Sequence, residues 1–75
     1  MADHLLDAKG LNCPLPILKT KKVLKGVPIG ETLCVLATDP GSVADFEAFC
    51  RVTGNQLLES SQTGSTYSFL IKRLA

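Results

Sequence analysis

The sequence predicts an α+β fold, a two-layer α/β sandwich in which two helices pack on one face of a mixed four-stranded sheet. Three observations predict it: four short strand-like runs, two stretches of helical periodicity, and Gly or Pro at the boundaries between them. Taken in chain order, these segments read β-α-β-α-β-β, which favours a two-layer packing. With 75 residues in all, we expect residues 1–75 to form a single domain with one modest core. So small a core favours a carrier, a binding module or a partner-dependent catalyst over a self-contained enzyme.

A short strand and a proline-marked turn lead into the first helix. Residues 4–8 are a strand candidate, which Gly10 ends. Proline fixes φ and is tolerated in the first helical turn, where amides have no intrahelical partner, so Pro14 suits the helix start. The residue before a proline prefers extended geometry, so we expect Cys13 to be the helix cap. The helix is predicted to end at residue 24 or 25, before a glycine.

The first helix has an apolar face and a lysine face at about 100° per residue. The predicted inner face consists of Pro16, Ile17, Thr20, Val23 and Leu24. Lysines occupy the other side, and two leucines lie on or near it. We interpret part of this side as a partner-binding surface next to Cys13, made of Leu15, Leu18, Lys19 and Lys22. The alternative is an ordinary solvated helix surface with exposed leucines.

The second strand is predicted at residues 31–38, where a continuous apolar run is typical of a central buried strand. A second helix follows, and two starts are open. Either Asp39 caps it with Pro40 in the first turn, or Ser42 caps it with Asp45 three residues later.

The second helix is predicted to end at Gly54, and the chain then forms a hairpin. The inner stripe of this helix is expected to be Val43, Phe46, Phe49, Cys50 and Thr53. Residues 55–60 and 66–74 are the last two strands, joined by a turn at 62–65.

Charge is segregated along the chain although the net charge is only +1. Residues 9–25 hold five lysines and no acid, whereas residues 26–65 hold five acids and one arginine. The basic face therefore belongs to the Cys13 segment and suits an acidic protein or a phosphate backbone. Since only four side chains are aromatic and two are expected in the core, no base-stacking platform is evident. Direct nucleic-acid binding is therefore not expected.

The N-terminus lacks the features of an export signal, and no apolar run approaches the roughly 20 residues that a membrane-spanning helix needs. We therefore expect a cytoplasmic protein with no membrane association. The three cysteines are far apart in the sequence and form no closely spaced pair, so reduced thiols are expected. For the same reason we expect no metal, and we expect no cofactor. Cys34 and Cys50 are predicted to be small buried hydrophobes. The alternative is that one of them resolves Cys13 or joins it in metal binding.

Cys13 is the candidate reactive residue. Helix N-termini favour the nucleophilic thiolate, so we expect an exposed, somewhat acidic and rigidly presented thiol. Pro16 occupies the place where a Cys-x-x-Cys pair would have its second sulfur, which disfavours dithiol exchange. The only histidine, His4, lies near the N-terminus, so a Cys-His dyad is not expected. A lone activated thiol without a base suits group transfer between proteins, with sulfur held as a persulfide.

Residues 6–16, LDAKGLNCPLP, resemble the signature of the TusA/SirA/YedF family of sulfur carriers. The apolar strand ending in Thr38-Asp39-Pro40, the Phe49-Cys50 helix and the final hairpin are similar too, so the resemblance covers nearly the whole chain. It implies a βαβαββ fold and persulfide transfer by Cys13. The other residues that match the family motif, in supporting roles, are Asp7, Gly10, Pro14 and Pro16. We interpret Gly10 as permitting the sharp turn and Asp7 as fixing it through backbone hydrogen bonds.

The same resemblance implies the partners. A cysteine desulfurase or a rhodanese would donate sulfur, and an acceptor protein would take it toward tRNA thiolation, molybdenum-cofactor assembly or sulfur oxidation. The protein is then a sulfurtransferase-type carrier rather than a self-contained catalyst. The alternative hypothesis is a regulatory module that binds protein or RNA and in which Cys13 is not essential.

Overall fold

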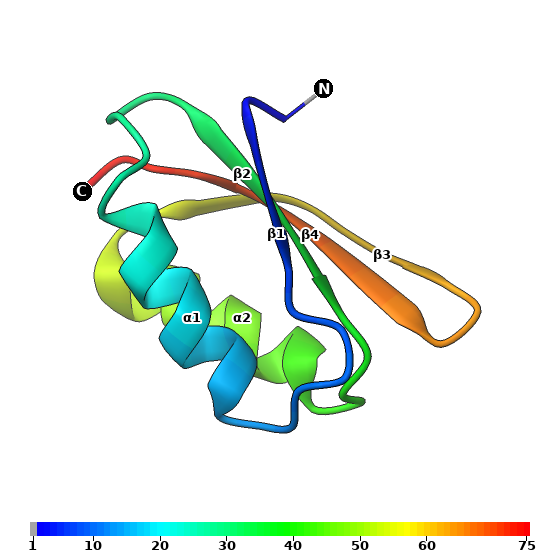
Figure 1. Ribbon diagram of the computed structural model, residues 1–75. Coiled ribbons are helices and arrows are strands. Elements are labelled where there is room, and N and C mark those ends of the chain that lie inside the picture. Colours follow the sequence, from blue (N-terminus) through cyan, green and yellow to red (C-terminus); the bar gives the residue numbers. More distant parts are fainter. Residues whose placement is uncertain (1) are drawn as a thin grey trace.

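A computed structural model describes residues 2–75 and shows the predicted α+β sandwich (Figure 1). Its elements are β1 (His4–Asp7), α1 (Leu15–Leu24), β2 (Thr32–Ala37), α2 (Ser42–Thr53), β3 (Gln56–Thr63) and β4 (Thr66–Lys72). The sheet order is β1-β2-β4-β3. β1 runs parallel to β2 and the other neighbours are antiparallel, so the sheet is mixed. Both helices lie on one face of the sheet (Figure 1).

The core lies between that face and the helices. β2 is central in the sheet, and its side chains alternate because successive residues of a strand point to opposite faces. Val35 of β2 is paired with Phe69 of β4, and both are fully buried. The Phe69 ring stacks on Phe46 of α2, with centroids 4.5 Å apart. This stack joins the sheet to α2 at the middle of the core.

The prediction that Cys34 is buried was wrong. Its side chain is half-buried on the face of the sheet without helices, because Leu33 and Val35 on either side of it point into the core. Its Sγ lies 3.5 Å from the Ser68 Oγ on β4. Cys50, by contrast, is 3% exposed and belongs to the core, as predicted.

The helix faces follow the predicted periodicity in outline. α1 buries Pro16, Thr20 and Leu24, whereas Val23 is exposed rather than on the inner face. The Thr20 hydroxyl donates to the Pro16 carbonyl at 2.8 Å, which satisfies a polar group inside the core. Gly54 ends α2 with a φ of 79°, a left-handed conformation that favours glycine.

Neither predicted cap of α2 is present. Gly41 occupies the N-cap position, and no side chain there forms a capping hydrogen bond. Ser42 is the first helical residue instead, and its side chain is 1% exposed. Among residues 2–75, its Oγ has no hydrogen-bond partner. The Asp45 side chain accepts a hydrogen bond from the Cys13 thiol instead.

The C-terminal hairpin differs from the prediction at both strands, since β4 already ends at Lys72, two residues before the predicted end at residue 74. β3 continues to Thr63, three residues beyond the expected end, so the turn consists of Gly64 and Ser65. In the part of the chain that the structure describes, neither helix has the length and apolar character that crossing a bilayer requires.

Candidate functional site

The loop from β1 to α1 is tied to its surroundings at three points. The Ala8 N–H donates to the Leu36 carbonyl at 2.8 Å, which continues the pairing of β1 with β2. The Asp7 carboxylate accepts the Lys9 N–H at 3.0 Å, and the Gly10 N–H donates to the Thr38 hydroxyl at 2.9 Å. Gly10 has a φ of 82°, a conformation that side chains other than glycine rarely adopt. These contacts hold the loop against the end of β2.

Cys13 lies in a turn just before α1 and is not its cap. The Leu15 N–H donates to the Asn12 carbonyl at 2.8 Å, so the chain already turns ahead of the helix. Pro14 takes the N-cap position and Pro16 lies in the first turn, where its missing N–H costs nothing. The Cys13–Pro14 peptide bond is cis. Cys13 therefore precedes the helix by two positions, and its side chain is exposed.

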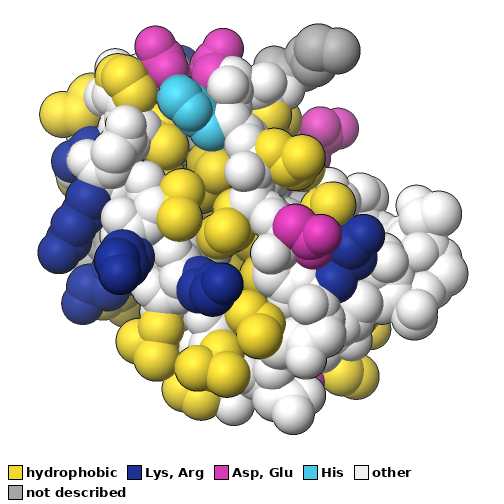
Figure 2. Space-filling model, viewed as in Figure 1, with side chains coloured by type: hydrophobic (Ala, Val, Ile, Leu, Met, Phe, Trp, Pro, Cys, Tyr) yellow, Lys and Arg dark blue, Asp and Glu magenta, His cyan; other side chains and the backbone are white. Residues whose placement is uncertain are grey.

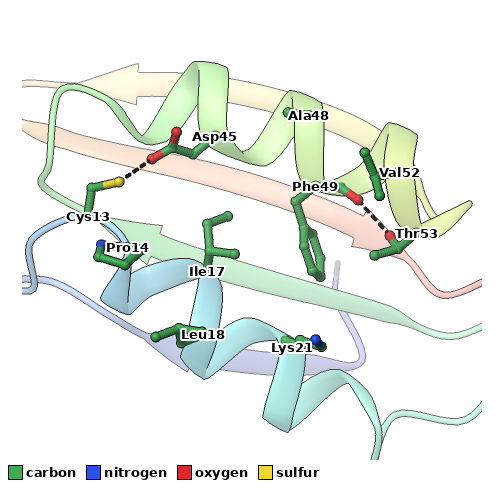
Figure 3. Close-up of a pocket in the computed structure, with 10 residues that line it drawn as sticks. All are labelled: Cys13, Pro14, Ile17, Leu18, Lys21, Asp45, Ala48, Phe49, Val52 and Thr53. Atoms are coloured by element: carbon green, nitrogen blue, oxygen red, sulfur yellow. Dashed lines mark hydrogen bonds between the residues drawn. The ribbon is translucent and has the colours of Figure 1, made fainter.

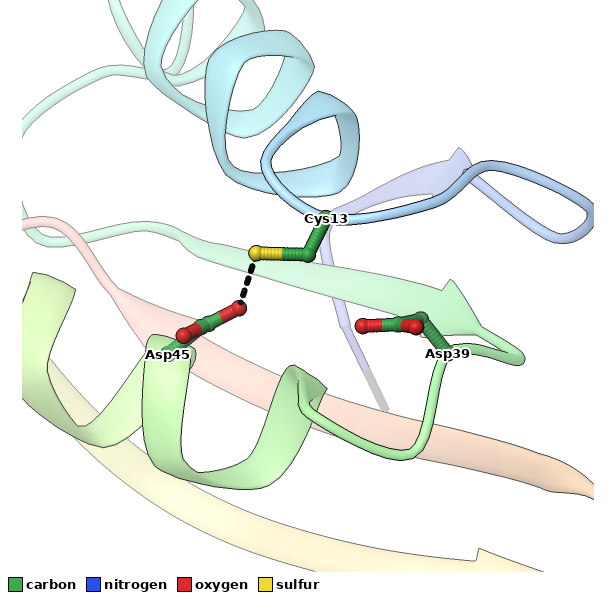
Figure 4. A group of neighbouring side chains, drawn as sticks. All are labelled: Cys13, Asp39 and Asp45. Atoms are coloured by element: carbon green, nitrogen blue, oxygen red, sulfur yellow. Dashed lines mark hydrogen bonds between the residues drawn. The ribbon is translucent and has the colours of Figure 1, made fainter.

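The Cys13 thiol is close to two carboxylates. Its Sγ donates a hydrogen bond to the Asp45 Oδ2 at 2.8 Å, across 32 residues of sequence. One side-chain oxygen each of Asp39 and Asp45 and the Cys13 sulfur all lie within 4.8 Å of one another (Figure 4). Asp39 reaches this position from the loop after β2, and Asp45 from the first turn of α2.

The carboxylates raise the pKa of the Cys13 thiol. The hydrogen bond to Asp45 is the main cause, followed by desolvation and by the negative charges of Asp45 and Asp39. The prediction of an acidic thiol was therefore wrong. That prediction relied on positive potential from the helix N-terminus and from nearby lysines. The Lys9 Nζ, however, lies 3.9 Å from the Asp7 carboxylate, with which it forms an ion pair. The two negative charges near the sulfur raise the thiol pKa by more than the helix N-terminus lowers it, because prolines have removed amides from that terminus.

Cys13, Asp39 and Asp45 are also the described residues that could together ligate a metal ion. They offer one sulfur and two oxygens, whereas structural zinc centres use four ligands, mostly Cys and His. We assign no metal to this group.

A groove of about 470 Å³ runs between α1 and α2 from the Cys13 sulfur (Figure 3). It is lined by Cys13, Pro14, Ile17, Leu18, Lys21, Asp45, Ala48, Phe49, Val52 and Thr53. Cys13 and Asp45 lie at one end, and Lys21 and Thr53 at the other (Figure 3). Since most of these side chains are apolar, the groove is an exposed apolar surface next to the Cys13 thiol.

The predicted partner-binding residues separate into two groups. Leu18 lines the groove and is 54% exposed. The other three are exposed on α1 but do not line it: Leu15, Lys19 and Lys22. Lysine side chains gather over α1 in the space-filling view, with apolar side chains below them (Figure 2).

Sequence reasoning missed several residues of the site. Asp39 and Asp45 were interpreted as helix-capping residues and Phe49 as a core residue, while Val52 was not considered. Val52 offered a local signal, because it is an apolar residue outside the predicted inner stripe of α2. In the structure it is 81% exposed. The carboxylates offered none, because only the packing of α1 beside α2 brings them to Cys13.

The fold and the site together define a class of protein: a small α+β domain that presents one exposed thiol at the end of an open apolar groove. Comparison with known proteins makes the class specific. The family model described as sulfurtransferase TusA matches residues 4–73. The chain therefore belongs to the TusA family, and its role is that of a sulfur carrier.

Individual relatives agree with this assignment. The chain is 58% identical over 71 residues to the sulfur carrier protein TusA of Allochromatium vinosum, covering 95% of this chain and 93% of that protein. It is 47% identical over 72 residues to a relative in Neisseria meningitidis, covering 96% and 97% respectively. The crystal structure of a SirA-like protein from Desulfitobacterium hafniense has the same fold, with a TM-score of 0.82 at 23% identity and coverage of 96% and 99%.

Proposed function

We propose that Cys13 carries sulfur as a persulfide, loaded by a cysteine desulfurase or a rhodanese and passed on to an acceptor protein. The observation that supports it most is the position of the thiol. Cys13 is the exposed cysteine of the three, and its sulfur lies at the end of an apolar groove that a partner can fill. Cys34 is half-buried on the other face of the sheet and Cys50 is in the core, so neither is presented in this way.

The surroundings of Cys13 support a carrier that depends on its partners. His4 lies at the start of β1, whereas Cys13 follows the end of that strand. The His4 Nε2 is 2.8 Å from the Glu31 carboxylate, so the histidine is engaged elsewhere. Without an imidazole beside the thiol, donor and acceptor proteins are expected to supply much of the catalysis. We further propose that the relay operates in the cytoplasm and ends in tRNA thiolation, molybdenum-cofactor assembly or sulfur oxidation.

Intact-mass measurement tests the proposal. The protein is incubated with a cysteine desulfurase and L-cysteine, and the gain of one sulfur, about 32 Da, is followed. We expect the gain in the wild-type protein and in Cys34→Ser, and its absence in Cys13→Ser. Sulfur found on Cys34 or Cys50 in peptide maps would contradict the assignment of the carrier cysteine.

Complementation of a deletion strain distinguishes the carrier from the regulatory module. A carrier requires Cys13, so Cys13→Ala is expected to fail. Full complementation by Cys13→Ala together with failure of Leu18→Glu would favour the module. A mixed disulfide trapped on Cys13 in cell extract, identified by mass spectrometry, would name the acceptor.

A further inference from the structure

We propose that Asp45 is a catalytic residue of sulfur transfer, the base that accepts the Cys13 thiol proton as the sulfur attacks its donor. This inference rests on the proposed function of Cys13 as the persulfide carrier. It assigns to the chain one component of the chemistry that would otherwise fall entirely to the partners.

The geometry places a carboxylate oxygen where a base is needed. The Asp45 Oδ2 is 2.8 Å from the Cys13 Sγ, within the reach of about 2.6–3.2 Å that direct proton transfer requires. Asp45 lies in the first turn of α2, and its own N–H donates to the Gly41 carbonyl at 3.2 Å, so its backbone is held in the helix. The side chain points from α2 across to Cys13 (Figure 4).

The carboxylate is not neutralised by a cation. Within residues 2–75, the ion pairs are those of His4 with Glu31 and of Lys9 with Asp7, and neither involves Asp39 or Asp45. The Asp45 carboxylate therefore faces the thiol without a salt bridge to any cation in the described part of the chain.

The charges around Cys13 create the need for a base. The groups that face the thiol are Asp45 from α2 and Asp39 from the loop before it, and Lys21 of α1 lies at the far end of the groove. Because the two carboxylates raise the pKa of Cys13, the resting thiol keeps its proton at neutral pH. A protonated thiol is a poor nucleophile, so attack must be coupled to removal of this proton.

The step balances without any oxidant or reductant. The Cys13 sulfur attacks the outer sulfur of the donor's cysteine persulfide while its proton passes to the Asp45 carboxylate. The new bond joins Cys13 to the outer sulfur, and the sulfur–sulfur bond of the donor breaks with its electron pair on the donor's cysteine. That departing thiolate takes the proton from Asp45. The products are a donor thiol and a Cys13 persulfide, and Asp45 is again a carboxylate.

Asp45→Asn and its matched control Asp39→Asn test the role in two assays. The first follows iodoacetamide alkylation of Cys13 against pH, resolved by peptide mass. The second measures the rate of Cys13 persulfidation by a cysteine desulfurase with L-cysteine, as a function of carrier concentration. Asparagine has nearly the same shape as aspartate but is neutral and a very poor base, so each change removes the carboxylate function alone.

The two assays are expected to move in opposite directions for Asp45→Asn. Alkylation at neutral pH should be faster, because the thiol loses the acceptor that keeps it protonated. Persulfidation at saturating carrier should be slower by on the order of 10²-fold, the usual contribution of a general base, with the half-saturating concentration little changed. Asp39→Asn removes a charge near the thiol but leaves its hydrogen bond to Asp45, so alkylation and persulfidation should both be modestly faster.

Several results would overturn the role of Asp45. Persulfidation of Asp45→Asn at or above the wild-type rate would show that the carboxylate only suppresses the thiolate. Slower alkylation together with slower persulfidation would indicate that the substitution displaces the Cys13 loop. A change only in the half-saturating carrier concentration would indicate that Asp45 contacts the docked donor. If the wild-type protein itself is not persulfidated on Cys13, the proposed function fails. If it is and Asp45→Asn behaves in one of these ways, only the base assignment fails.

Discussion

Leu18 offers a test of whether the groove beside Cys13 is where a sulfur donor docks. Its side chain is 54% exposed in the free protein and lines the groove. Complete burial of a leucine side chain contributes about 1.5–3 kcal/mol, so covering the exposed half would contribute about 1 kcal/mol. Since about 1.4 kcal/mol corresponds to tenfold in affinity, Leu18→Ala should weaken docking by about 5-fold.

The fold should tolerate this substitution. Exposed substitutions usually change the free energy of unfolding by less than about 0.5 kcal/mol, and alanine is a favourable helix residue. A loss of transfer in Leu18→Ala would therefore report on docking rather than on unfolding. A thermal melt followed by circular dichroism verifies that the variant is folded.

The assay measures Cys13 persulfidation by a cysteine desulfurase at increasing carrier concentrations. Leu18→Ala should raise the half-saturating concentration about 5-fold and leave the saturating rate unchanged, because Leu18 does not contact the reacting atoms. Leu5→Ala is the matched control, since Leu5 is 67% exposed on β1 and does not line the groove. An unchanged half-saturation in Leu18→Ala, or an equal increase in Leu5→Ala, would refute docking at the groove.

Two further predictions concern stability. Ser42→Ala removes a buried hydroxyl that has no partner among residues 2–75, so it should stabilise the fold by about 1 kcal/mol and raise Tm by roughly 4–8 °C; a lower Tm would contradict this. Burial raises the pKa of Cys50, so above the ordinary thiol pKa of about 8.5 the unfolded chain loses this proton before the folded chain does. The urea midpoint should therefore fall as pH rises from 8 toward 10. It should fall less steeply in Cys50→Ala, and equal slopes for the two proteins would exclude the contribution of Cys50.

Local patterns were sufficient to predict the elements of the fold. The apolar run at residues 31–38 identified the central strand β2, and Gly54 marked the end of α2. Both signals are local, since a continuous apolar run and a glycine that ends a helix involve residues within a few positions of one another. The boundaries depended on strand pairing: β3 continues three residues past the expected end because its partner β4 pairs with it as far as Thr63.

The environment of each cysteine depended on packing between distant segments. Cys34 lies in an apolar run, but both helices cover the other face of the sheet, so its side chain is only half-buried. The sequence predicted a buried Cys34, because alternation is invisible where the side chains from Leu33 to Ala37 are all apolar.

The order of residues along the chain is sufficient to place Cys13 between a strand and a proline-bearing helix start, with no second cysteine or histidine close to it in the chain. The surroundings of its sulfur, however, depend on how the two helices pack. α2 packs beside α1, which brings Asp45 to 2.8 Å from Cys13 and forms the groove that leads to it. A contact between residues 32 positions apart leaves no periodic or local signal in the sequence. The direction of the shift in the Cys13 pKa therefore follows from the packing of the two helices.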